Sequence, residues 1–186
     1  MADKARPIIA KARYEMSRTD AAQRLFFALL PDADTRAALA RLRPLAPGRA
    51  VPLENLHLTL AFLGRQPGAA VAPLEQILAR LALAPLALRI DKLGYFAGPR
   101  IAWAGMARPP AALLDLQARL MAALQQAGFA PDSHGGFRPH VTLARQAAPP
   151  PPDAAFAPLD WRVGRIALLA SGAADGLYRT LAERAL

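Results

Sequence analysis

Hydrophobic positions recur along the chain with two periods, which predict strands and helices in turn. Apolar or alternating runs bounded by Gly and Pro predict strands over 24–30, 57–63, 86–95, 100–106, 140–144, 162–170 and 177–184. Leucines at helical spacing predict helices over 70–83 and 109–127, and Asp32 is placed to cap a third helix that runs through Arg43. Several strands are neighbours in the sequence, so the pattern favours an α+β fold with antiparallel sheets.

The first 22 residues do not follow this pattern. They contain five basic residues and Pro7, without a sustained apolar period and without the apolar core of a secretory signal. We therefore expect 1–22 to be a flexible N-terminal extension and 23–186 to form a single domain. A transit peptide, or a true translation start at Met16, is an alternative explanation of this segment.

Composition excludes several classes of protein. The chain has 186 residues, of which 54% are hydrophobic and 20% charged, as in ordinary globular proteins. It has no cysteine, which excludes a disulfide framework, a thiolate metal site and a cysteine nucleophile. Uncharged stretches such as 166–174 have about half the length that spans a bilayer, so we expect no membrane association.

The charge indicates an anionic partner. The net charge is +9, and 20 of the 23 basic residues are arginine. Arginine binds phosphate through two parallel hydrogen bonds, which makes a polyanion a plausible ligand. A GC-rich genome would enrich arginine equally well, so the charge does not identify the ligand by itself.

One short pattern occurs twice. The sequence His-x-Thr-Leu begins at His57 and again at His140, 83 residues later. The chain has three histidines and five threonines, so two such coincidences have a chance on the order of a few in a thousand. Residues i and i+2 of a strand point to one face, so each copy presents a histidine and a threonine together. A strand whose polar face carries His and Thr for structural reasons is the alternative for either copy alone.

The repeated pattern predicts acid–base chemistry on a phosphate. If the two copies pack as a pseudo-twofold pair, two imidazoles and two hydroxyls meet in one cleft. One imidazole can then act as a base and the other as an acid, while the hydroxyls of Thr59 and Thr142 donate to phosphate oxygens. Such a set needs no metal and no covalent nucleophile. Glycine motifs for a nucleotide cofactor and acidic residues at metal-ligand spacing are both missing, so we expect neither a cofactor nor a metal.

The residues around both copies resemble a known family. Segments 24–28 (RLFFA), 55–64 (NLHLTLAFLG), 101–106 (IAWAGM) and 137–145 (FRPHVTLAR) are similar to the two-histidine (2H) phosphoesterases. Within these, the chain most resembles the bacterial RNA 2′,3′-cyclic phosphodiesterases, long named 2′-5′ RNA ligases. The resemblance covers 24–186. It implies a bilobal α+β fold with two pseudo-twofold-related antiparallel sheets, outer helices and a central cleft.

The same resemblance implies a reaction. It is the metal-independent hydrolysis of RNA 2′,3′-cyclic phosphodiester ends to 2′-phosphomonoesters, with His57 as proton donor and His140 as proton acceptor. Thr59 and Thr142 would bind the non-bridging oxygens, and Arg145 would balance the charge of the pentavalent transition state.

Other side chains are weaker candidates for substrate contacts. An aromatic side chain can stack on a terminal base, and the candidates are Phe26, Phe27, Tyr95 and Trp103, most of which we expect in the core. Arg138 is a candidate to contact the RNA backbone. His134 is expected in a surface loop.

Three alternatives to hydrolysis of RNA ends stay open. They are 2′-5′ RNA ligation, which reverses cleavage at the same site, action on another cyclic phosphodiester, and a non-catalytic RNA-binding module. The expected partners are RNA 3′ ends or small cyclic phosphodiesters. We expect a cytoplasmic monomer without an obligate protein partner.

Overall fold

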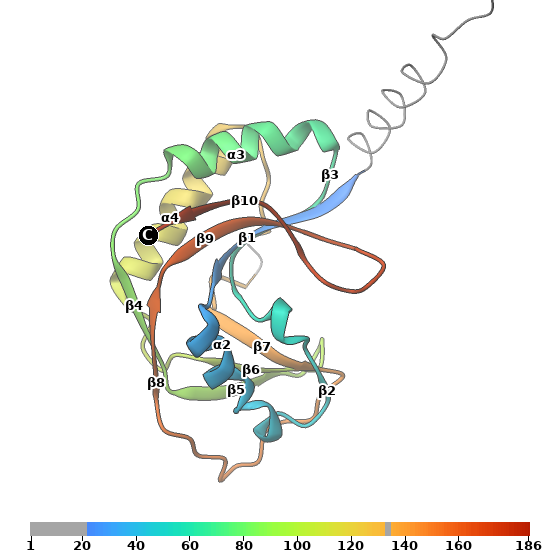
Figure 1. Ribbon diagram of the computed structural model, residues 1–186, viewed down its shortest axis with the longest axis vertical. Helices are drawn as coiled ribbons and strands as arrows, with labels where there is room; N and C mark the ends of the chain where they lie inside the picture. The colour runs from blue at the N-terminus through green and yellow to red at the C-terminus, as the bar shows by residue number, and fades with distance from the viewer. Residues whose placement is uncertain (1–21, 133–134) are drawn as a thin grey trace, which may run out of the picture.

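The computed structural model describes residues 22–132 and 135–186, which contain ten strands and three α-helices (Figure 1). The strands are β1 (Gln23–Leu30), β2 (Arg49–Ala50), β3 (Leu58–Gln66), β4 (Leu86–Ile90), β5 (Lys92–Phe96), β6 (Ile101–Gly105), β7 (His140–Arg145), β8 (Leu159–Val163), β9 (Arg165–Ser171) and β10 (Arg179–Ala185). The α-helices are α2 (Ala33–Ala40), α3 (Val71–Arg80) and α4 (Ala111–Gln126), and the 3₁₀ turns are η1 (Arg43–Leu45), η2 (Leu53–Asn55) and η3 (Gly68–Ala70). The expected extension lies outside the described residues except for Ala22, and so does His134.

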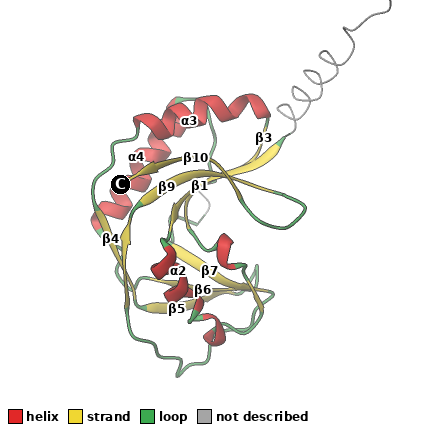
Figure 2. Ribbon diagram, in the orientation of Figure 1, coloured by secondary structure: helices red, strands yellow, loops and turns green. Residues whose placement is uncertain are grey.

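The strands form two antiparallel groups that meet at one point. Hydrogen-bonded neighbours follow the order β10-β9-β1-β3 in the first group and β7-β6-β5 in the second, where β2 also pairs with β7. Between the groups, β3 and β7 are joined by the single residue pair Leu58–Val141. Figure 2 shows the two groups as the two halves of the molecule. The antiparallel α+β architecture expected from the sequence is confirmed.

A separate two-stranded ribbon of β4 and β8 runs along one side of both halves (Figure 2). The single strands predicted over 86–95 and 162–170 are wrong, because each consists of two strands that belong to different sheets. The breaks fall at Asp91 and Gly164, where the backbone changes its hydrogen-bond partner. The Asp91 N–H donates to the Gly105 carbonyl, and the Gly164 carbonyl accepts from Leu186, each over 3.0 Å.

The helices follow from caps and from apolar stripes. The Asp32 side chain accepts a hydrogen bond from the Thr35 N–H over 2.8 Å and begins α2. This helix ends at Ala40 rather than near Arg43, and η1 follows, in which Pro44 cannot donate a backbone hydrogen bond. The buried stripe of α4 is Leu113, Leu116, Leu120 and Leu124. In the described ranges, no helix is long and apolar enough to cross a membrane.

The central strands β1 and β9 of the first group are buried on both faces. One face of β1 carries Leu25, Phe27 and Leu29, all fully buried in the main core together with the stripe of α4. The other face carries Phe26 and Ala28, which form a smaller apolar cluster with Ala167 and Leu169 of β9. Tyr178 packs against this smaller cluster. The smaller cluster therefore supports the side of the sheet that holds the repeated histidine motif.

Candidate active site

Leu58 and Val141, the paired residues that join the two halves, occupy the same position of the two His-x-Thr motifs. A local twofold axis passes between two residues that face each other in an antiparallel pair. It relates His57 to His140 and Thr59 to Thr142. Because the flanking residues of both strands point to the same face, the four side chains lie on one side of the junction. The pseudo-twofold packing predicted from the repeat is therefore present.

Both motif strands also have a β-bulge at the same place. Between β1 and β3 the register shifts so that Leu60 has no partner, and between β6 and β7 it shifts so that Leu143 has none. Each of these leucines is the third residue after its histidine. A bulge reverses the alternation of side chains beyond it, so the fifth residue after each histidine returns to the face of that histidine. These residues are Phe62 and Arg145.

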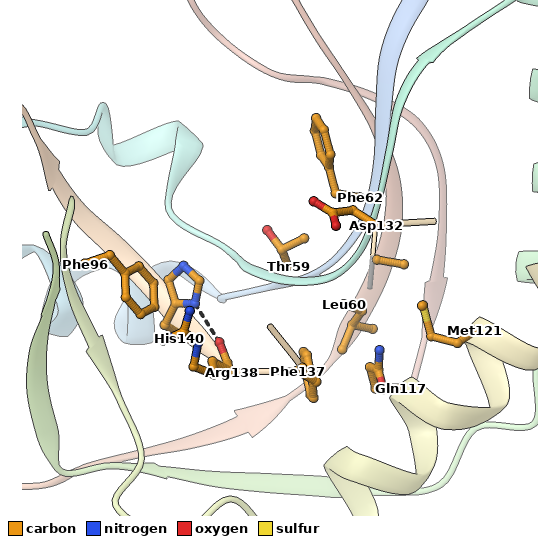
Figure 3. Close-up of a pocket in the computed structure, with 12 residues that line it drawn as sticks. Thr59, Leu60, Phe62, Phe96, Gln117, Met121, Asp132, Phe137, Arg138 and His140 are labelled. Carbon is orange, nitrogen blue, oxygen red and sulfur yellow. Dashed lines mark hydrogen bonds between the residues drawn. The ribbon is translucent and has the colours of Figure 1, made fainter. Parts of the chain in front are cut away.

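Both imidazoles are held by the same backbone contact. Nδ1 of His57 lies 2.6 Å from the Asn55 carbonyl oxygen, and Nδ1 of His140 lies 2.7 Å from that of Arg138. A carbonyl oxygen only accepts, so Nδ1 carries the hydrogen in both rings and Nε2 is the atom available for proton transfer. The Thr59 hydroxyl donates to Nε2 of His57 over 3.0 Å. Figure 3 shows the His140 contact as a dashed line.

Aromatic rings pack against both imidazoles. The His57 ring centroid lies 5.1 Å from that of Phe26 and 5.2 Å from that of Tyr178, which meets it edge-on at 81°. The His140 ring centroid lies 4.9 Å from that of Phe96, also edge-on at 89°, and 6.0 Å from that of Trp103. Packed rings restrict the imidazoles and shield them from water.

This environment lowers the pKa of both histidines. The pKa of His57 is lowered to about 4, and burial of the ring is the largest cause. The charges of His140 and Arg145 also lower this pKa, whereas the hydrogen bond to the Asn55 backbone raises it. Burial also lowers the pKa of His140, and the cations Arg138 and Arg145 add to the effect. Both rings are therefore neutral at pH 7 in the free protein. The charge of Arg145, at the end of β7, contributes to lowering the pKa of both rings.

A pocket of about 440 Å³ opens beside His140. Figure 3 shows Thr59 and His140 on one side of it and Gln117 and Met121 of α4 on the other. Its remaining lining includes three aromatic rings, Phe62, Phe96 and Phe137, together with the basic Arg138 and the acidic Asp132. A smaller pocket of about 140 Å³ lies beside His57 and Tyr178. The two histidines thus border two neighbouring pockets, each large enough for a small polar group and one large enough for a base.

The structure brings most of the predicted site residues together. Thr142 is half-buried and lies opposite Trp103, and Arg145 is exposed at the end of β7, opposite Ile101 and Arg49. Phe26 is only 3% exposed and packs against His57, so little of its ring is accessible.

Of the other three stacking candidates, Phe27 is fully buried in the core. Tyr95 is half-buried, and its hydroxyl donates to the Ala147 carbonyl over 3.1 Å. Trp103 is half-buried beside His140.

Sequence reasoning missed Phe62, Phe96, Tyr178 and the side-chain role of Asn55. Only Phe62 carries a sequence signal, because it stands at the same distance from its histidine as Arg145. Phe62 is 40% exposed at the pocket beside His140. Among the described residues, no group of three or more His, Cys, Asp or Glu is placed to hold a metal ion.

Comparison with known proteins agrees with this geometry. The model of the 2′-5′ RNA ligase superfamily matches residues 30–175, which include both motifs and the junction between them. The chain belongs to the 2′-5′ RNA ligase superfamily. Its similar relatives in this superfamily include the RNA 2′,3′-cyclic phosphodiesterase of Escherichia coli, 36% identical over 138 residues, which are 69% of this chain and 78% of the relative. That of Thermus thermophilus is 36% identical over 165 residues, or 80% of this chain and 81% of the relative.

Solved structures of the superfamily have the same fold. Escherichia coli LigT in complex with 3′-AMP aligns with a TM-score of 0.76 at 32% identity and covers 89% of this chain and 99% of LigT. A Thermus thermophilus structure aligns with a TM-score of 0.74 at 31% identity, covering 88% and 97% of the two chains. The bilobal 2H phosphoesterase fold implied by the sequence resemblance is confirmed.

Proposed function

We propose that this protein hydrolyses the 2′,3′-cyclic phosphodiester at RNA 3′ ends to a 2′-phosphomonoester. The observation that carries the proposal is the twofold-related pair of imidazoles, each held through Nδ1 with Nε2 available at one junction. Acid–base hydrolysis of a cyclic phosphodiester needs one base and one acid on opposite sides of the phosphorus atom. The names of the relatives support RNA and a cyclic phosphodiester as the substrate.

The proposed reaction is a displacement at phosphorus. Nε2 of His140 accepts a proton from water as the water oxygen attacks, and a new P–O bond forms. The bond from phosphorus to O3′ breaks, and Nε2 of His57 donates a proton to the leaving O3′. The protein gains one proton and loses one, so the two histidines exchange roles until a proton transfer through solvent restores them.

The donor role of His57 comes from the family resemblance, and its environment is compatible with it. A ring whose pKa is lowered by burial to about 4 gives up its proton readily. It must first hold one, and a phosphodiester anion bound beside it favours the charged form and raises this pKa. Substrate binding would therefore charge the acid that the reaction uses.

Arg145 and the two threonines would bind the phosphoryl oxygens. The bulge at Leu143 returns Arg145 to the face of His140 and Thr142, where a guanidinium can meet the charge that develops in the transition state. The Thr59 hydroxyl, now bonded to His57, is placed to turn to a non-bridging oxygen. Arg138 and Phe26 are proposed as further substrate contacts, with Arg138 in the pocket beside His140.

We also infer that the protein works without metal or cofactor, as a monomer in the cytoplasm, and needs no protein partner. A matched acid and base supply both proton transfers, so the proposed chemistry requires no Lewis acid. RNA 3′ ends or small cyclic phosphodiesters are the proposed substrates.

The test is incubation with a short oligonucleotide that ends in a 2′,3′-cyclic phosphate, in the presence of EDTA, with separation of 2′- and 3′-phosphate products. We expect a 2′-phosphate at a rate that EDTA does not change. Ligated RNA as the main product would favour 2′-5′ ligation. Turnover of a cyclic nucleotide but not of the oligonucleotide would favour small diesters, and binding without turnover would favour a non-catalytic module.

A further inference from the structure

Asn55 connects His57 to a loop that lies far along the chain. Its side chain is only 5% exposed and makes two hydrogen bonds to the β9–β10 loop, residues 172–178. Nδ2 donates to the Gly176 carbonyl over 2.8 Å, and Oδ1 accepts from the Tyr178 N–H over 2.9 Å. The backbone oxygen of the same residue holds Nδ1 of His57. Asn55 therefore contacts both the imidazole and the loop beside it.

The loop brings Tyr178 against His57. The Tyr178 ring lies 5.2 Å from the imidazole and 5.0 Å from Phe26, and Phe26 lies 5.1 Å from the imidazole. The three rings form a closed triangle in which Phe26 and Tyr178 both pack against the imidazole. The pKa of His57 is lowered first of all by burial, and Phe26 and Tyr178 are the rings that pack against this imidazole.

The bonds within the loop do not fix this position. The Leu177 N–H donates to the Asp175 side chain, and the Gly176 N–H donates to the Ala173 carbonyl, and both contacts are local turns. Figure 1 shows that the loop projects from the ends of β9 and β10. A buried amide that satisfies one donor and one acceptor of this loop is what ties it to the motif.

The half of the molecule that carries His140 has a similar arrangement, in which different residues provide the backbone contact to Nδ1 and the aromatic ring against the imidazole. Arg138, two residues before His140, also holds its histidine through its backbone oxygen. Its guanidinium lies 4.6 Å from the centre of the Phe96 ring, and Phe96 meets His140 edge-on. In both halves, the residue two positions before the histidine binds Nδ1 with its backbone and holds an aromatic ring against the imidazole with its side chain.

We propose that Asn55 is a positioning residue of the catalytic site, which holds Tyr178 against His57 and so keeps this imidazole oriented and shielded from water. Its effect on turnover rests on the proposed function. Its effect on His57 does not, and can be measured without substrate.

Charged groups near His57 also affect the pKa that a titration of this residue measures. Across the junction these are His140 and Arg145, and along the small pocket they are Arg36, Glu54, Arg165 and Glu183. The substitutions proposed below leave all of them in place. Asn55 and Tyr178 are not among these charged groups, so removing either side chain changes the shielding of His57 and leaves its charged neighbours unchanged.

The experiment is an NMR titration of the imidazole signals of His57 and His140 in the wild type, Asn55→Ala, Tyr178→Ala and the double variant. All variants keep the backbone oxygen that holds Nδ1. We expect both single variants to raise the pKa of His57 from about 4 toward the ordinary 6.5, by about one unit or more, and to leave that of His140 in place. The double variant should equal either single one, because both remove the same shield.

A control and a kinetic measurement complete the test. Gln66→Ala removes another amide, bonded to the Leu63 carbonyl on the far part of β3, and should leave both histidines unchanged. With a cyclic-phosphate substrate, Asn55→Ala should lower kcat more than it raises KM. An unchanged His57 pKa in Tyr178→Ala overturns the proposal, even if Asn55→Ala does not fold. Shifted titration without any turnover in the wild type would retain the positioning role and reject the proposed function.

Discussion

Leu58 and Val141 face each other across the only pair that joins β3 to β7 among the described residues. Each is the middle residue of a His-x-Thr motif, so one contact between two apolar residues sets the position of two imidazoles and two hydroxyls. Both side chains are fully buried, which fixes this register against a slip of one residue. The geometry of the site is thus determined by core packing directly beneath it.

The lowered pKa values predict an activity optimum on the acid side of neutrality. The donor must be protonated and the acceptor neutral, and in the free protein both rings lose their protons below the ordinary 6.5. The pH profile of kcat/KM, which reports the free protein, should therefore be bell-shaped, rise above about pH 4 and fall before pH 7. The two limbs belong to the coupled pair. A flat profile between about pH 5 and 9 would contradict the acid–base account.

The same pKa shifts predict how stability depends on pH. The folded-state pKa of His57 lies below its unfolded value, so the unfolded chain binds more protons between about pH 4 and 6.5. Stability should therefore be highest above this window and decrease as the pH falls through it, by up to about 1.4 kcal/mol per pH unit for each histidine. Urea unfolding at several pH values measures the slope, and His57→Gln should reduce it. An equal slope in the variant would show that His57 is not buried as described.

Arg145→Ala should lower kcat about 10²- to 10³-fold with little change in the melting temperature. The loss is that of one preorganised donor to the transition-state charge, and the side chain is exposed, so the fold does not depend on it. Steady-state kinetics with a cyclic-phosphate oligonucleotide give the number. Arg119→Ala, an exposed arginine on α4, controls for the loss of one positive charge. Equal effects of both substitutions would reduce Arg145 to a general electrostatic contribution.

Gly94→Ala should disturb His140 from the neighbouring strand. Gly94 lies opposite Trp103, and a Cβ at this position would overlap the Trp103 ring, which packs against His140. Moving that ring should cost about 1–3 kcal/mol of stability and lower kcat as well. Gly98→Ala, in the turn of the same hairpin, has open space for its Cβ and should change neither the melting temperature nor kcat. If Gly94→Ala behaved like Gly98→Ala, Trp103 would have no role in holding His140.

Features of this fold that depend on neighbouring residues could be predicted from the sequence, whereas features that depend on contacts between distant residues could not. His57 and Thr59 are two residues apart, so in any regular strand their side chains point to the same face. The bulges at Leu60 and Leu143 leave no such signal, since both segments look like regular alternation, and plain alternation would place Arg145 on the opposite face. The resemblance to the family supplied what periodicity could not.

Contacts between distant segments could not be predicted from the sequence either. Asn55 and Tyr178 are 123 residues apart, and nothing in either local sequence indicates that one amide holds the other residue. The strand predicted over 86–95 ran through Asp91 because the apolar pattern continues there, although the hydrogen-bond partners change. Local patterns predicted the elements and the motif, whereas the loops and rings around the motif required the tertiary structure.

The most direct test of the central claim is turnover of an oligonucleotide with a 2′,3′-cyclic phosphate end by the wild type, His57→Ala, His140→Ala and the Arg119→Ala control. We predict that each histidine variant loses about 10²- to 10⁴-fold in kcat while it still folds and binds the RNA end, and that the control retains full activity. Turnover that survives in either histidine variant would contradict catalysis by this pair.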